Sequence, residues 1–215
     1  MLETAPPPPP SVFTATSAYS LAGVAGIAII ATTAARKLLP RNAPWQDRVT
    51  FIWLTFDALI HFIFEGSFLA LSTFGRTVNA SSGVFAQMWR EYAAADSRWG
   101  TADSTVVSLE LLTVFGAGPL AALIVYQIVK RDPARHYWIV VLSTAELYGG
   151  WMTFCPEWLT GSPSLDTSNV LFFWVYLVFM NIIWVLTPVW LMYDSYTYIA
   201  GSLRSAQVVK ARKAE

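Results

Sequence analysis

Residues 49–71 read VTFIWLTFDALIHFIFEGSFLAL, an apolar run interrupted by Asp57, His61 and Glu65. A helix that crosses the hydrocarbon core of a bilayer needs about 20 mostly apolar residues, and this run has that length. Ionisable side chains inside such a segment are costly, so they usually face the interior of a helix bundle and mark function. The run therefore predicts a membrane-spanning helix whose inner face carries chemistry.

The composition of the whole chain is that of an integral membrane protein. Of the 215 residues, 55% are hydrophobic and 13% are charged, whereas a soluble domain averages about 25% charged residues. Acidic and basic residues balance at 14 each, which argues against a nucleic-acid-binding protein because phosphate contacts need a basic surplus. A single cysteine, Cys155, excludes an internal disulfide and a multi-cysteine zinc site.

Four further apolar runs of similar length predict an all-α integral membrane protein with five transmembrane helices. In lipid, the backbone N–H and C=O groups of each segment must form hydrogen bonds with one another, as they do in a helix. The expected transmembrane domain covers residues 17–200, after a proline-rich, flexible N-terminal tail (1–16) and before a basic cytosolic tail (201–215). Pro6–Pro10 predict a stiff polyproline spacer in the first tail. The expected spans are 17–35, 49–71, 105–129, 136–155 and 170–193.

The distribution of Lys and Arg predicts the orientation of these spans. Of the 14 basic residues, only Arg76, Arg90 and Arg98 lie in the second loop; the others lie in the first and third loops and in the C-terminal tail. Cytosolic loops are enriched in Lys and Arg, so we expect a lumenal N-terminus and a cytosolic C-terminus. The second loop contains FAQMWREYAAADSRW (85–99), which predicts a short amphipathic helix on the membrane surface.

Ionisable residues within the spans are the main functional signal. Asp57, His61 and Glu65 recur every four residues and share one helix face, which indicates an acid–base unit or, alternatively, a polar pair that holds helices together. Asp57 can also serve only to orient the imidazole or to face cytosolic water. Glu110 is expected at the depth of Glu65, where two carboxylates would share a proton, unless Glu110 faces lumenal water. Thr113 lies three residues after Glu110 on the same face and can donate a hydrogen bond to it.

The fourth and fifth spans add further polar candidates. Asn181 and Trp184 share a face, where the amide can hold a hydroxyl and the indole ring can face a cation or merely pack. Glu146 supports the site or lines a pore, and the small residues Gly149 and Gly150 beside it predict close helix approach.

No cofactor is expected from the sequence. His61, Glu65 and Glu110 would make a three-ligand set, but the usual zinc ligand sets are missing, so we expect no metal. No phosphate-binding loop or serine hydrolase motif is present in the sequence.

Several stretches, in order along residues 45–200, match a known family: IHFIFEGSF (60–68), MWREY with ADSR (88–98), SLELLT with GPL (108–120), LYG (147–149) and FWVYLVFMNIIW (173–184). In these stretches the chain resembles the emopamil-binding protein family, the Δ8–Δ7 sterol isomerases (3β-hydroxysteroid isomerases) of the endoplasmic reticulum. The resemblance implies a fold of five transmembrane helices and an enzyme that moves a sterol ring double bond from C8=C9 to C7=C8.

The resemblance also implies residue roles. His61, Glu65 and Glu110 are the expected catalytic groups: Glu65 or His61 protonates C9, and its partner accepts the proton from C7. Cation-stabilising or substrate-binding roles are expected for Trp184, Asn181, Thr113, Tyr92 and Tyr148. Supporting roles are expected for Asp96 and Arg98 of the matching loop motif and, from their positions in the spans and not from the resemblance, for Asp57 and Glu146.

The sequence departs from the family pattern at three positions. Trp99 replaces a tyrosine, Glu146 replaces an amide, and Asp57 stands where the family has no acid. These changes bear on proton balance and substrate preference.

The expected partners are a Δ8-sterol substrate, cationic amphiphilic amines as inhibitors, membrane lipid and a second copy in a homodimer, in the endoplasmic reticulum membrane. Asn79 begins a glycosylation sequon, and Arg212-Lys213 resembles a weak retrieval signal. Two alternatives stay open, a non-catalytic sterol or drug receptor related to the sigma-2 receptor and a proton-coupled transporter.

Overall fold

A computed structural model describes residues 13–214; the predicted polyproline spacer lies outside the described residues. Within this range the chain is helical, and its one β-type pairing is an isolated antiparallel bridge between Asp96 and Leu165. The elements are α1 (Ala15–Leu38), α2 (Trp45–Leu59), η1 (Ile60–Glu65), α3 (Gly66–Ser72), α4 (Val84–Ala95), α5 (Arg98–Thr101), α6 (Ser104–Leu112), η2 (Thr113–Ala117), α7 (Gly118–Lys130), α8 (Arg135–Leu159), η3 (Phe172–Phe179) and α9 (Met180–Arg212).

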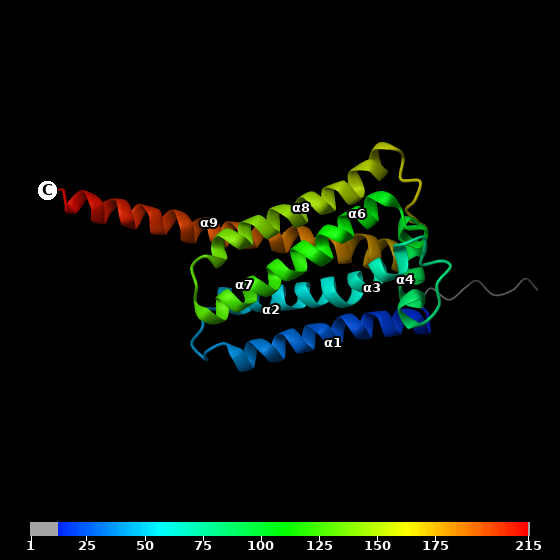
Figure 1. Cartoon of the computed structure of the whole chain (residues 1–215), viewed down its shortest axis with the longest axis horizontal. Helices are drawn as coiled ribbons and strands as arrows, with labels where there is room; N and C mark the ends of the chain where they lie inside the picture. Colours follow the sequence, from blue (N-terminus) through cyan, green and yellow to red (C-terminus); the bar gives the residue numbers. More distant parts are fainter. Residues whose placement is uncertain (1–12, 215) are drawn as a thin grey trace, which may run out of the picture.

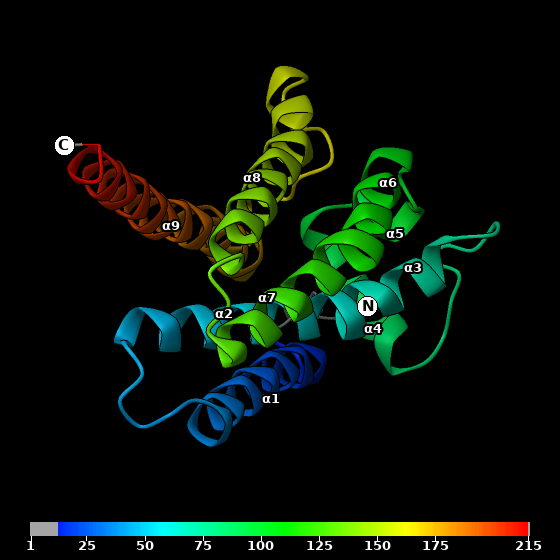
Figure 2. The ribbon, with the colours of Figure 1, turned by 60° about the vertical axis from the view of Figure 1, so that its left-hand side comes forward.

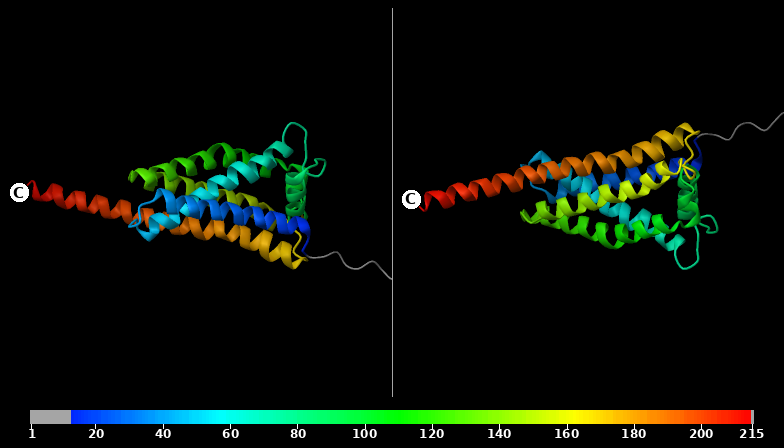
Figure 3. Two further views of the ribbon diagram at one scale, coloured as in Figure 1. Left: turned by 90° about the horizontal axis from the view of Figure 1, so that it is seen from below. Right: turned by 90° about the horizontal axis from the view of Figure 1, so that it is seen from above.

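The long segments run along a common axis, and the short helix α4 crosses one end of them (Figure 1). These segments are α1, α2–η1–α3, α6–η2–α7, α8 and η3–α9. Figure 3 shows that α9 continues past the other helices at the end opposite α4. The amphipathic helix predicted over 85–99 corresponds to α4, which buries Trp89 and Ala93. This helix therefore packs on the end of the bundle and does not contact only the membrane surface.

Within residues 13–214, four segments are long and apolar enough to cross a membrane, judged by length and composition. They are Ala15–Leu38, Trp45–Ser72, Ser104–Lys130 and Phe172–Arg212. The fifth predicted span is present as the 25-residue helix α8 but is not among these four. Its sequence includes Glu146, Glu157 and several hydroxyl side chains, which lower its mean hydropathy.

Three π-helical segments, η1, η2 and η3, interrupt the expected α-helices. Such segments are rare, and they occur frequently at functional sites. Residues from all three line the same cavity. The sequence pattern gave no indication of them.

The described residues form three buried apolar clusters around that cavity. The largest cluster joins α1, α2, α7, α8 and α9 through fully buried side chains such as Phe51, Ile124 and Leu191. In the second cluster, beside α4, the Trp99 ring stacks on Trp89 at 5.0 Å between centroids and contacts Phe68 at 4.7 Å. The third includes Tyr176 of η3, and residues of all three clusters line the cavity.

Candidate active site

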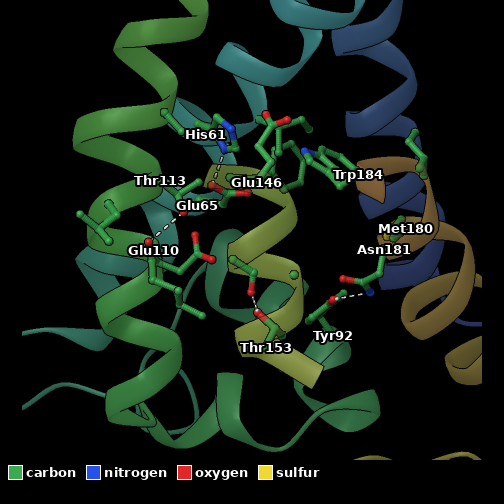
Figure 4. Close-up of a pocket in the computed structure, with 18 of the residues that line it drawn as sticks. His61, Glu65, Tyr92, Glu110, Thr113, Glu146, Thr153, Met180, Asn181 and Trp184 are labelled. Atoms are coloured by element: carbon green, nitrogen blue, oxygen red, sulfur yellow. Dashed lines mark hydrogen bonds and ion pairs between the residues drawn. The ribbon is translucent and has the colours of Figure 1, made fainter. Parts of the chain in front are cut away.

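The central cavity has a volume of about 600 Å³, and its walls are mostly apolar. Small-molecule pockets are typically about 300–1,000 Å³, so this cavity has room for a lipid-sized ligand. The polar side chains on its wall include Tyr148. Figure 4 shows others: His61, Glu65, Tyr92, Glu110, Thr113, Glu146, Thr153, Asn181 and Trp184.

His61 on η1 has a carboxylate at each ring nitrogen. Its Nδ1 lies 2.6 Å from Glu65 Oε2, and its Nε2 lies 3.1 Å from Asp57 Oδ1. His61 and Asp57 are buried, with 2% and 0% of their surface exposed. The structure thus brings together the three residues that the spacing placed on one face, although the backbone carrying them changes from α-helix to π-helix between Leu59 and Ile60.

Glu110 extends this group from the neighbouring helix. It is buried on α6 and lies beside Glu65, so Glu65 stands between Glu110 and His61 (Figure 4). The hydrogen bond predicted from Thr113 to Glu110 is wrong: the Thr113 hydroxyl donates to the Leu109 carbonyl at 2.8 Å. Threonine in a helix commonly bonds the carbonyl one turn earlier.

Gly118 permits the close approach that brings these helices together. A Cβ at this position would lie 3.0 Å from the Phe62 ring and 3.2 Å from the His61 Cβ. The prediction that Gly149 and Gly150 permit close helix packing is wrong, because a Cβ at either position would meet no atom within 4 Å. The sequence shows that a residue is small but not what lies opposite it.

A second acid pair occupies the Nε2 side of His61. Asp57 Oδ1 accepts a hydrogen bond from Trp184 Nε1 at 2.9 Å. One carboxylate oxygen of Asp57, one of Glu146 and a ring nitrogen of His61 all lie within 4.8 Å of one another. Asp57 Oδ2 and both Glu146 carboxylate oxygens are buried without a hydrogen-bond partner. Two residues that depart from the resembled family pattern therefore meet at one place.

The spacing of Asp57, His61 and Glu146 would also suit a metal ion. The bonds to Trp184 and Glu65 use Asp57 Oδ1 and His61 Nδ1. Asp57 Oδ2, His61 Nε2 and both Glu146 oxygens have no hydrogen-bond partner among the described residues, so these atoms can hold an ion or share protons. Like charges confined in a low-dielectric site cannot all ionise cheaply, so neighbouring acids share protons. We therefore interpret the trio as part of a proton-sharing cluster with Glu65 and Glu110.

Asn181 and Tyr92 form a polar corner on the opposite wall. The Asn181 amide donates to the carbonyls of Tyr176 at 2.9 Å and Leu177 at 3.0 Å, where η3 passes into α9, and it lies 3.5 Å from the Tyr92 hydroxyl. Burial raises the pKa of Tyr92 on α4, so its hydroxyl stays protonated. This corner can hydrogen-bond a polar group on a ligand.

Asp96 and Arg98 lie outside the cavity and hold its wall in place. Arg98 bonds the Asp96 carboxylate through Nη2 at 2.6 Å and Nε at 2.9 Å, and its Nη1 donates to the Thr153 carbonyl on α8 at 2.7 Å. The ADSR motif therefore ties the second loop to α8. Tyr148 lies at the rim of the cavity, with 62% of its surface exposed.

Residues 84–195 match the family model described as EXPERA (EXPanded EBP superfamily). The chain belongs to this superfamily. It is 28% identical over 158 residues to the 3-beta-hydroxysteroid-Delta(8),Delta(7)-isomerase of Cavia porcellus, covering 74% of this chain and 67% of the relative. The same enzyme of Mus musculus is 29% identical over 167 residues (77% and 71%). The isomeliandiol synthase of Melia azedarach is 30% identical over 143 residues (66% and 65%).

The EXPERA match confirms the resemblance drawn from the sequence, and it spans the segments from α4 into α9. Sequence reasoning missed Ser20 and Val24 of α1, which also line the cavity. No sequence signal pointed to them, because the first span contains no ionisable residue before its last turn.

Proposed function

We propose that this EXPERA protein is a sterol isomerase that moves a ring double bond from C8=C9 to C7=C8. The observation that carries the proposal is a continuous acid–base series on the wall of a largely apolar cavity, with the buried Asp57 beside it. On the wall, Glu110 and His61 are buried and Glu65 and Glu146 are half-buried. Relatives named as 3-beta-hydroxysteroid-Delta(8),Delta(7)-isomerases supply the reaction.

The reaction needs one proton added and one removed. Protonation of C9 uses the electron pair of the C8=C9 bond and leaves a tertiary carbocation at C8. Loss of a proton from C7 returns the C–H electron pair to form C7=C8, so the net composition is unchanged. Water would capture the cation, and an apolar, closed site excludes it.

His61, Glu65 and Glu110 carry the proton transfers in this proposal. Glu65 or His61 donates to C9, and its partner accepts from C7. The carboxylates supply fixed negative charge near the cation, and the Trp184 ring faces it while Asp57 holds the indole N–H.

Binding groups lie away from the proton-transfer cluster. Asn181 and Tyr92 bind the polar end of the sterol, and Thr113 and Tyr148 contribute to the cavity wall. The same negative cluster in an apolar cavity favours cationic amphiphilic amines, which resemble the carbocation and would bind as transition-state analogues.

We place the protein in the endoplasmic reticulum membrane as a homodimer of five-span chains. The spans are the four long apolar segments and α8, and residues 17–200 form the transmembrane domain. The excess of Lys and Arg in the first loop, the third loop and the C-terminal tail supports a lumenal N-terminus and a cytosolic C-terminus.

Turnover of a Δ8-sterol by purified protein in heavy water tests the activity. We expect the Δ7 isomer with deuterium at C9. Glu65→Gln and Glu110→Gln should each lose ~10²–10⁴-fold in rate, the usual effect of removing a general acid–base group. The control is Asp103→Asn, which removes a carboxylate outside the cavity while asparagine still caps α6.

Two outcomes would contradict the proposal. If a folded Glu65→Gln or Glu110→Gln variant keeps near-normal turnover, that residue is not an acid–base group. If the unmodified protein binds the Δ8-sterol tightly but does not convert it, the protein is a sterol receptor and not an isomerase.

A further inference from the structure

Hydrogen bonds tie helix α8 to other segments near its two ends, and its middle borders the cavity. Near its start, His136 Nδ1 lies 3.2 Å from the Ser195 hydroxyl of α9. Near its end, the Thr153 carbonyl accepts the bond from Arg98. Between these points, the residues that border the cavity are Ala145, Glu146, Tyr148, Gly149 and Gly150.

Several residues line the cavity and also have large exposed surfaces. They are Leu112 (72% exposed) and Gly116 on the α6–η2 segment, Ala145 and Tyr148 on α8, and Phe179 (59% exposed) on η3. Four of these five residues lie on the α6–η2 segment and on α8, so we place the main opening of the cavity between these two segments. Figure 2 shows how α8 and α6 are arranged in the bundle. Because both segments belong to the proposed spans, this opening faces lipid.

Three glycines keep the opening free of side chains. A Cβ at Gly116, Gly149 or Gly150 would meet no atom within 4 Å, and all three residues line the cavity. Gly118 is different, because a Cβ there would lie 3.0 Å from Phe62. Gly116, Gly149 and Gly150 therefore have open space where a side chain would lie, whereas Gly118 allows Phe62 to pack closely against the backbone.

We propose that the gap between η2 and α8 is the passage through which an apolar, sterol-sized substrate reaches the cavity from the bilayer, and that Gly116, Gly149 and Gly150 keep it open. The substrate class rests on the proposed function. A rigid ring system needs a passage of fixed width, and a side chain added at these positions would narrow it. The reacting groups stay buried behind the opening, with Glu110 and His61 only 8% and 2% exposed.

The test measures the binding kinetics of a fluorescent sterol on the reconstituted full chain. Gly149→Leu and Gly116→Leu should slow association and dissociation by a similar factor of at least tenfold, while the equilibrium dissociation constant changes by less than threefold. Equal effects on both rates identify a passage rather than a binding contact, because binding contacts act mostly on dissociation. Gly26→Leu is the matched control, since a Cβ there also meets no atom within 4 Å but Gly26 does not line the cavity.

A reversible block makes the test independent of folding. In a Cys155→Ala background, Gly149→Cys would be labelled with a bulky, reducible thiol reagent. Labelling should slow both rates, and reduction should restore them in the same sample. Unchanged rates after complete labelling would overturn the proposal, and so would a change in oligomeric state on labelling, which would identify the gap as an interface between copies. Sterol binding is measured without turnover, so this result is separate from failure of the isomerase assay.

Discussion

Replacing Arg98 with methionine should strongly destabilise the protein, because Arg98 links the second loop to α8. It bonds Asp96 through two nitrogens and donates to the Thr153 carbonyl, and its Nε lies 3.7 Å from Glu157 Oε1. Only 7% of Arg98 and 1% of Asp96 are exposed. Burial alone would lower the pKa of Arg98, but its bonds to Asp96 and the nearby carboxylates raise the pKa overall, so the side chain stays charged.

The size of the effect follows from these contacts. Arg98→Met leaves the buried Asp96 carboxylate without its partner, and breaking a buried ion pair in this way costs about 3–5 kcal/mol. For a chain of this size, each kcal/mol lowers the midpoint of thermal unfolding by about 2–4 °C. The expected loss is therefore about 6–20 °C.

Thermal unfolding in detergent, followed by tryptophan fluorescence, measures this loss. Arg76→Met is the control, because Arg76 lies in the same loop but is exposed, and surface substitutions usually change stability by less than about 0.5 kcal/mol. Asp96→Asn combined with Arg98→Met should recover part of the loss by removing the unpaired charge. A midpoint for Arg98→Met within about 2 °C of the unmodified protein would refute the role given to this ion pair.

Two further predictions concern the cavity. Asp57→Asn should lower kcat/KM by about 10–100-fold, because a hydrogen bond to a charged group contributes about 1.5–3 kcal/mol and the asparagine oxygen can still accept from Trp184; an unchanged kcat/KM in steady-state kinetics would show that the charge beside His61 has no part in turnover. Tyr92→Phe should raise KM by about 2–10-fold with little change in kcat, as expected for loss of one neutral hydrogen bond. Loss of kcat alone in that variant would place Tyr92 among the reacting groups.

The sequence predicts the helical segments and much of the candidate site because those features depend on local spacing. A four-residue interval brings Asp57 and Glu65 to the same imidazole, and this holds although η1 is π-helical. The position of Glu110 along its span predicts how deeply it lies in the membrane, and hence that it lies near Glu65. Ionisable residues are rare in apolar runs, so each one stands out against its surroundings.

Features set by tertiary contacts could not be read from the sequence. The bond from Trp184 to Asp57 joins residues far apart in the chain, and the empty space beside Gly149 depends on where η2 lies. The three π-helical segments likewise form where packing around the cavity favours an extra residue in the turn. The sequence also does not show which of several nearby acceptors a hydroxyl will choose. The Thr113 hydroxyl donates to a backbone carbonyl of its own helix and not to Glu110.

The acid cluster and the lipid-facing opening are consistent with a single scheme. Isomerisation adds one proton and removes one, so the cluster returns to its starting protonation state after each turnover and takes up no net proton. Several acids that share protons around His61 can donate at one position of the ring system and accept at another. Exchange of these protons with solvent between turnovers carries deuterium to C9, but the reaction itself needs no continuous supply of protons through an aqueous channel. An opening toward the bilayer therefore serves both delivery of an apolar substrate and exclusion of the water that would capture the cation.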